Sequence, residues 1–113
     1  MAYFAFEQEP NQEFIFELTD QEKIDHARRI ISGEETERVH VMGRINKRKV
    51  PYNPQWDYYL NPDTISFFAY AIEVCDANMQ YVDDHLDEAC GPFLSGCYWC
   101  PWNSRVVREV KIP

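Results

Sequence analysis

The chain has 113 residues, of which 45% are hydrophobic and 15% aromatic, and its formal net charge is −8 at pH 7. This composition excludes an intrinsically disordered chain, and the length suits a single globular domain over residues 1–113. The acidic balance disfavours nucleic acid and anionic membrane surfaces as partners, and no apolar run approaches the roughly 20 residues of a spanning helix.

The N-terminal residues suggest no signal peptide, because residues 1–7 lack a basic segment and turn acidic at once. We therefore expect a cytoplasmic protein as the sequence is written, or a secreted one if a leader has been removed. Residues 1–12 begin apolar and become polar around Pro10, which fits an edge strand or an arm.

A strand and a helix are predicted next. Residues 13–18 alternate with period two and place Phe14, Phe16 and Leu18 on one face of a strand. Thr19 and Glu22 have the spacing of a capping box, and apolar residues then recur at helical spacing. Gly33 ends the predicted helix 20–32.

The middle of the chain predicts three strands. Residues 39–45 and 56–60 read as strands, separated by a loop that contains two prolines. Residues 65–74 are rich in β-branched and aromatic residues, which favours a strand that forms a hairpin with 56–60. Asn61 followed by Pro62 would also suit a helix start at this point.

The last third predicts a second helix and a final strand. Asp76 or Asn78 would cap the helix, and the Cys90-Gly91-Pro92 sequence would end it. Residues 105–112 read as a strand. The order β-α-β-β-β-α-β predicts an α+β fold, with an antiparallel sheet of about five strands and two helices packed on one face.

The cysteines allow three interpretations. Two disulfides, Cys75–Cys100 and Cys90–Cys97, would staple the C-terminal third. Alternatively, Cys90, Cys97 and Cys100 with Cys75 or His85 would form a structural zinc site, although the second knuckle of such a site is missing. Cys97 and Cys100 also form a CxxC pattern, but Pro101 and the loop-like flanks do not suit a redox-active motif.

The loop after the second predicted strand is the main candidate binding site. It carries four nearby cations, Arg44, Lys47, Arg48 and Lys49, and two prolines that stiffen it. A rigid, basic, exposed loop resembles what a substrate-like protease inhibitor presents, and a solvated hairpin loop is the plainer interpretation. The predicted partner contacts are Lys47, Arg48, Lys49, Pro51, Tyr52 and Trp56.

Two further clusters have plain structural interpretations. Asp83, Asp87, Asp84 and Glu88 form i,i+4 pairs of like charge on the second helix, which fits a solvated face. The aromatic residues near the two loops could bind a sugar or peptide, but aromatic residues in a small domain are usually core. They are Tyr52, Trp56, Tyr58, Trp99 and Trp102.

Enzyme motifs are absent from the sequence. It contains no G-x-S-x-G, P-loop, G-x-G-x-x-G or H-E-x-x-H pattern. The histidines His26, His40 and His85 are scattered, which fits surface or capping roles. We therefore expect neither catalysis nor a cofactor.

Three stretches carry a resemblance to a known family. They are residues 34–43 (EETERVHVMG), residues 72–77 (IEVCDA) with 81–86, and residues 99–102 (WCPW) with 105–110. Together they resemble a family of small bacterial domains, also found in some eukaryotic microbes, with no established activity. The likeness spans about residues 13–111 and implies a single domain in which Cys75 pairs with Cys100.

The sequence thus predicts a non-enzymatic domain whose partner is a protein, and a protease is one such partner. The alternative is a small zinc-binding domain that uses the C-terminal cysteine and histidine cluster.

Overall fold

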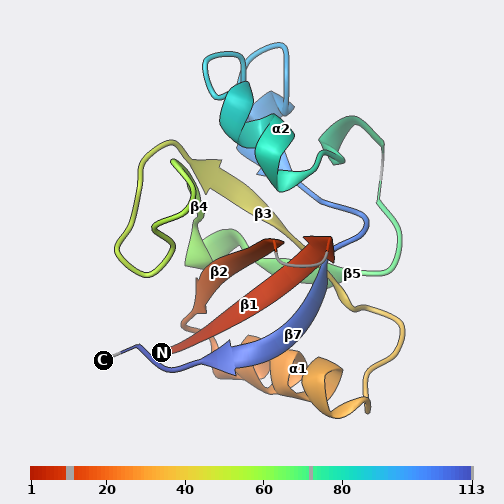
Figure 1. The fold of residues 1–113 in the computed structure, drawn as a ribbon. Helices are drawn as coiled ribbons and strands as arrows, with labels where there is room; N and C mark the ends of the chain where they lie inside the picture. Colours follow the sequence, from red (N-terminus) through yellow and green to blue (C-terminus); the bar gives the residue numbers. More distant parts are fainter. Residues whose placement is uncertain (10–11, 72, 113) are drawn as a thin grey trace.

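The computed structural model describes residues 1–9, 12–71 and 73–112 and confirms the α+β class (Figure 1). Two antiparallel sheets and two α-helices make up the fold. The strands are β1 (Ala2–Glu9), β2 (Gln12–Leu18), β3 (His40–Asn46), β4 (Tyr59–Leu60), β5 (Ser66–Phe68), β6 (Tyr98–Trp99) and β7 (Arg105–Val110). The helices are α1 (Gln21–Ser32) and α2 (Met79–Asp84).

The first sheet has the order β2-β1-β7, so the N-terminal strand lies at its centre. Phe4 faces Phe16 and Phe6 faces Phe14 across the β1–β2 ladder, which places four buried rings on one face. β7 pairs with the other side of β1, with an irregularity between Ala5 and Phe6. The structure thus confirms a strand in the predicted segment 1–12, of which residues 10–11 lie outside the described residues, but its predicted place at a sheet edge was wrong because β7 comes from the far end of the chain.

Helix α1 confirms the predicted helix but not its predicted cap. Asp20 is the N-cap residue, and its Oδ1 accepts a hydrogen bond from the Glu22 N–H at 2.9 Å. The predicted Thr19–Glu22 capping box was therefore wrong, because with Asp20 as N-cap the third helical residue is Lys23, which has no carboxylate to return the bond. Gly33 ends the helix as predicted, at a φ of 88°, where a side chain would strain the backbone.

Strand β3 organises the second sheet. β4, β5 and β6 each pair with it in antiparallel orientation. Gly43 permits this crowding, because a Cβ there would lie 3.2 Å from Ile65 Cγ1 and 3.3 Å from Leu60 Cδ2. The predicted hairpin of 56–60 with 65–74 was wrong, since both short strands pair with β3 instead of with each other.

The segment from residue 61 to 75 is also less regular than predicted. Asn61 and Pro62 start only a 3₁₀ turn, Pro62–Thr64, and the strand that follows ends at Phe68. A second 3₁₀ turn, Glu73–Cys75, lies where the strand was expected to continue.

Helix α2 is shorter than predicted. Asn78 caps it by accepting a hydrogen bond from the Tyr81 N–H at 2.7 Å, and it ends at Asp84 instead of near Cys90. Residues after the helix turn sharply, with a positive φ at Cys90, Leu94 and Cys97. The two helices do not share one face of a sheet, because α1 covers the first sheet and α2 lies at the opposite end of the molecule (Figure 1).

Aromatic side chains join the two sheets in one core. The Trp99 ring lies 5.1 Å from Phe14, 5.7 Å from Phe6 and 5.3 Å from Tyr58, measured between ring centroids. The polar atoms of the buried rings are satisfied, since Trp99 Nε1 donates to Ala77 O and the Tyr58 hydroxyl donates to Met79 O. Within the described residues, no helix is long and apolar enough to cross a membrane.

Candidate functional site

The basic loop, residues 47–58, connects β3 to β4. Its ends are held together by antiparallel pairing of Ile45 with Leu60 and of Asn46 with Tyr59. Within the loop, the Asn53 N–H donates to Val50 O at 3.1 Å, and the Trp56 N–H donates to Asn53 O at 3.4 Å. The loop is therefore folded into consecutive turns.

Asn53 fixes the loop to the first sheet. Its side chain is 2% exposed, accepts the Ile15 N–H through Oδ1 at 3.0 Å and donates to Tyr58 O through Nδ2 at 3.3 Å. Trp56 is also buried and donates from Nε1 to Glu13 O at 3.0 Å. Both residues bond to β2, so the loop covers an edge of that sheet that would otherwise be open.

Aromatic packing adds a second attachment. Tyr52 packs against Tyr3 of β1 with ring centroids 5.1 Å apart, and burial raises the pKa of its phenol.

Glu13 of β2 and Arg108 of β7 form a two-point ion pair with distances of 2.6 and 3.0 Å. The Arg108 hydrogen bonds lower the pKa of the Glu13 carboxyl, so the carboxylate stays ionised.

The tip of the loop carries the charge. Lys47, Arg48, Lys49 and Pro51 are exposed. The Arg48 guanidinium lies 5.4 Å from the centre of the Tyr59 ring and donates to the Tyr59 hydroxyl at 3.3 Å. Lys49 Nζ lies 3.4 Å from Asp57 Oδ1, but both side chains are more than half exposed, so this pair contributes little to stability.

The structure thus divides the predicted partner-binding residues into two groups. The first group is exposed to solvent and consists of the three cations Lys47, Arg48 and Lys49 with Pro51. In the second group, Trp56 is buried and Tyr52 is half-buried. Trp56, which was predicted as a partner contact, is only 6% exposed, and its Nε1 is bonded to Glu13 O of β2. The anchor that sequence reasoning missed is Asn53, whose only signal was its place between two prolines.

The cysteines form two disulfides, Cys75–Cys100 and Cys90–Cys97, with Cα atoms 5.1 and 4.2 Å apart. These are the pairs expected from the sequence. The sulfurs of the alternative zinc site are consequently bonded to one another, and the described residues contain no cluster that could hold a metal ion. His85 packs parallel to Tyr81 at a centroid distance of 4.0 Å.

The predicted acidic helix face is divided between two segments. Asp83 and Asp84 lie in α2, while Asp87 and Glu88 follow its end, so the i,i+4 pairs do not share a helix. Asp83 Oδ1 accepts the Asp57 N–H at 2.9 Å and thereby ties α2 to the end of the basic loop.

The other histidines have structural partners. His26 Nε2 lies 2.9 Å from Arg38 O, and the His26 ring stacks on Phe67. His40 Nδ1 lies 2.6 Å from Ser104 O. Because a carbonyl accepts, Nδ1 carries the proton in neutral His40.

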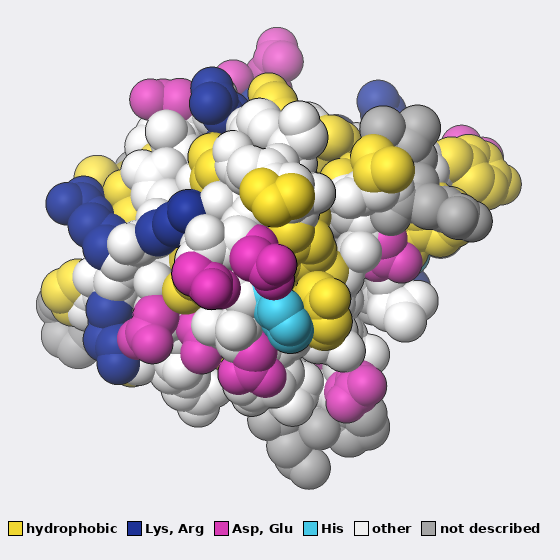
Figure 2. All heavy atoms as spheres, turned by 90° about the horizontal axis from the view of Figure 1, so that it is seen from above, with side chains coloured by type: hydrophobic (Ala, Val, Ile, Leu, Met, Phe, Trp, Pro, Cys, Tyr) yellow, Lys and Arg dark blue, Asp and Glu magenta, His cyan; other side chains and the backbone are white. Residues whose placement is uncertain are grey.

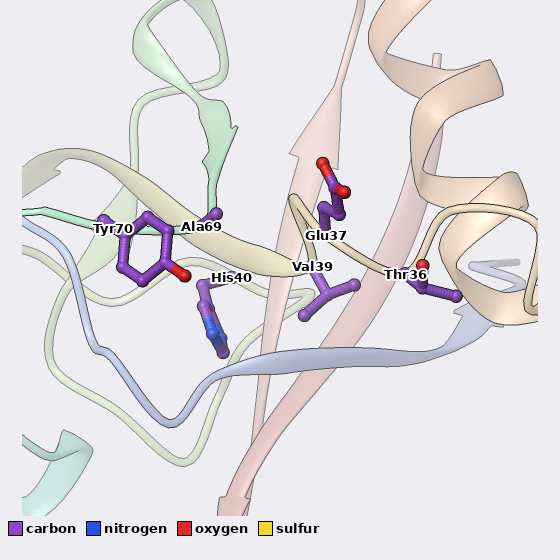
Figure 3. A pocket seen from close by; sticks show the side chains of 6 residues that line it. All are labelled: Thr36, Glu37, Val39, His40, Ala69 and Tyr70. Carbon is purple, nitrogen blue, oxygen red and sulfur yellow. The ribbon is translucent and has the colours of Figure 1, made fainter.

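His40 also lines an open pocket of about 480 Å³ (Figure 3). Figure 3 shows His40 and Tyr70 at one end of this pocket and Thr36 at the other, near α1. Glu37, Val39 and Ala69 complete the lining. Among the hydrogen bonds of the described residues, none joins two of these lining residues.

Comparison with known proteins identifies one family. The family model described as the BP-74 N-terminal domain matches residues 1–113, which is more of the chain than the resemblance over 13–111 covered. No curated protein matches the chain, and no solved structure does.

Proposed function

The chain belongs to the BP-74 N-terminal domain family, and we propose that it is a non-enzymatic protein-binding domain that contacts its partner through the tip of the basic loop, residues 47–51. The observation that carries this proposal is the contrast between the root and the tip of one loop. Asn53 and Trp56 are buried and hydrogen-bonded to β2, while Lys47, Arg48 and Lys49 are exposed.

A fixed loop lowers the free-energy cost of association. Ordering a flexible side chain at an interface costs about 0.5–1.5 kcal/mol, and ordering a flexible backbone adds to this cost. In the basic loop the backbone is already held at both ends, and Arg48 already rests on Tyr59. A partner therefore meets a surface whose shape changes little on binding.

The charge of the tip defines the partner's chemistry. Lys47, Arg48 and Lys49 lie together in a chain whose net charge is −8, so the rest of the molecule repels the acidic surface that the tip attracts. This contrast orients an acidic partner toward the loop and makes association dependent on salt. A protease that accepts lysine or arginine in its specificity pocket is the narrower form of this proposal.

Two defined probes test the proposal. With trypsin as the probe, the inhibition of its activity by the domain is measured, which tests for a substrate-like loop. With a glutamate-rich peptide as the probe, the binding affinity is measured, which tests for recognition of acidic surfaces in general. In the triple variant K47S/R48S/K49S we expect the affinity for at least one probe to fall about tenfold or more, while the melting temperature stays nearly constant because exposed charges contribute little to stability. A triple variant R29S/R105S/K111S, which removes three exposed cations elsewhere, is the matched control.

The outcomes separate the two forms of the proposal. Inhibition of trypsin that is lost only in the loop variant supports the inhibitor form, while peptide binding without inhibition supports the broader one. Equal losses in the loop and control variants would show a nonspecific effect of net charge and overturn the proposal. A loop variant that unfolds would overturn it as well, since the cations would then be structural.

A further inference from the structure

A second candidate binding site lies where α2 begins, away from the basic loop tip. Asp76, Ala77, Asn78, Tyr81 and Phe93 line an open pocket of about 380 Å³ there. Figure 2 looks onto the side of the molecule that carries α2 and shows acidic side chains next to a histidine and to hydrophobic side chains.

Two aromatic rings form walls of this pocket. Tyr81 and Phe93 lie with their centroids 5.3 Å apart and their planes at 76°. Tyr81 is 48% exposed, so its ring is accessible to a ligand. The stacked His85 ring covers one face of Tyr81, so the opposite face of Tyr81, beside the Phe93 ring, is the one that can receive a ligand.

The walls are held in position from outside the pocket. His85, which does not line it, stacks on Tyr81 with planes 19° apart, and its Nδ1 lies 2.8 Å from Tyr81 O. Phe93 belongs to the segment closed by the Cys90–Cys97 disulfide, and its N–H donates to Glu88 O at 3.2 Å. The aromatic corner is therefore largely preorganised.

The charge around the pocket is negative. One oxygen of Asp76 accepts the Trp102 N–H at 2.9 Å, and Asp76 is one of the residues that line the pocket. No lysine or arginine is among the lining residues that the structure describes. Asp84, Asp87 and Glu88, on and after α2, are exposed nearby in sequence and add to the negative potential.

We propose that this pocket binds an alkylammonium group, such as the side chain of a lysine or methylated lysine presented by a protein partner. A cation is attracted to the faces of aromatic rings, and a carboxylate beside those rings strengthens the attraction. A neutral sugar would gain from the rings but not from the surrounding charge. This site is independent of the basic loop and has the opposite charge preference.

The test uses short peptides and the intact, disulfide-bonded domain. A peptide containing trimethyllysine is compared by calorimetry and NMR with one in which the quaternary nitrogen is replaced by carbon. We expect the charged peptide to bind about tenfold more tightly and to shift the signals of Tyr81 and Phe93. Asp76→Asn should weaken binding about twofold to fivefold, and it retains an oxygen for the Trp102 N–H.

Variants of the aromatic wall complete the test. Tyr81→Ala should lower the affinity about tenfold, whereas Tyr81→Phe should keep most of it because the π-face remains. Tyr70→Ala, which removes a tyrosine that is 94% exposed and lies outside this pocket, is the matched control. Equal binding of the charged and neutral peptides, or binding of a methyl glycoside in place of the charged peptide, would overturn the proposal.

Discussion

The two ends of the molecule are stabilised in different ways. The first sheet and α1 use long hydrogen-bonded ladders, a capped helix and buried phenylalanines. Residues 69–104 contain a six-residue helix, 3₁₀ turns and a two-residue strand, and they carry both disulfides. Most of the backbone hydrogen bonds between described residues of this segment close single turns of three to five residues, and the two disulfides add links between its more distant parts.

The difference explains where binding surfaces can form. In β2, period-two alternation places Phe14, Phe16 and Leu18 in the core. In residues 69–104 the disulfides fix the backbone, so side chains such as Tyr81 and Trp102 can remain exposed without loss of order. The basic loop combines both strategies, because it is irregular but is fixed by hydrogen bonds to a regular strand.

The largest effect is expected at the residue that joins the two regions. Phe14 lies in β2 and contacts Phe6, Tyr58 and Trp99, so Phe14→Ala should lower the free energy of unfolding by about 3–5 kcal/mol. Urea denaturation measures the loss, and Ile31→Ala, at a side chain that is 39% exposed, is the control. A loss below about 1 kcal/mol would show that the sheets do not share one core.

The second prediction concerns the two disulfides and tests whether the two regions unfold independently. The Cys75–Cys100 link closes a longer segment than Cys90–Cys97, with sequence separations of 25 and 7. Replacing the first pair by serine should cost about 3 kcal/mol, and replacing the second should cost less, because loop entropy grows with loop length. Hydrogen exchange should show that amides of residues 76–99 lose more protection than those of β1. Equal losses would mean that the two regions unfold as one unit.

The third prediction concerns the hydrogen bonds of Asn53 that fix the irregular basic loop to β2. Asn53→Ala leaves the Ile15 N–H and the Tyr58 carbonyl without a partner, at a cost of about 1–3 kcal/mol. The loop should then become a site of rapid trypsin cleavage at Lys47 to Lys49, whereas the parent domain and Asn103→Ala stay uncut there. Rapid cleavage of the parent would show that the loop is flexible without the substitution.

The smallest effect concerns the helix cap. Asp20→Ala should lower the free energy of unfolding by about 1 kcal/mol, because it removes the acceptor of the Glu22 N–H. Thr19→Ala should change it by less than about 0.5 kcal/mol, since Thr19 is exposed and is not the capping residue. Thermal denaturation of the pair distinguishes the two, and a larger effect at Thr19 would assign the cap to that residue instead.

Local signals in the sequence were sufficient where local physics decides the structure. The alternation of Phe14, Phe16 and Leu18 gave the strand and its buried face, and helical spacing with Gly33 gave α1. The two disulfide pairs agree with one of the three interpretations that the cysteine positions had left open. In the basic loop, charge and proline content predicted an exposed tip.

Choices between distant partners could not be predicted. The sequence of residues 56–74 did not predict that both short strands pair with β3. Alternation of apolar and polar residues predicts which face of a strand is buried, but not which strand lies beside it. The end of α2 at Asp84 was missed because residues 85–89 contain no glycine or proline that would mark a helix end. The burial of Trp56 likewise depends on β2, which is distant in sequence, as the 43-residue separation of their hydrogen bond shows.

The central position of β1 has a consequence for biosynthesis. Ala5 pairs with Arg108, so one side of the first strand stays without its partner until nearly all the other residues of the domain have been translated. During that time a β1–β2 hairpin exposes Phe4, Phe6, Phe14 and Phe16, which is a surface that chaperones recognise and that aggregates readily. Completion of the sheet closes a very long loop, and such nonlocal contacts slow folding. Maturation of the domain therefore follows the release of residues 105–110 from the ribosome and does not proceed gradually along the nascent chain.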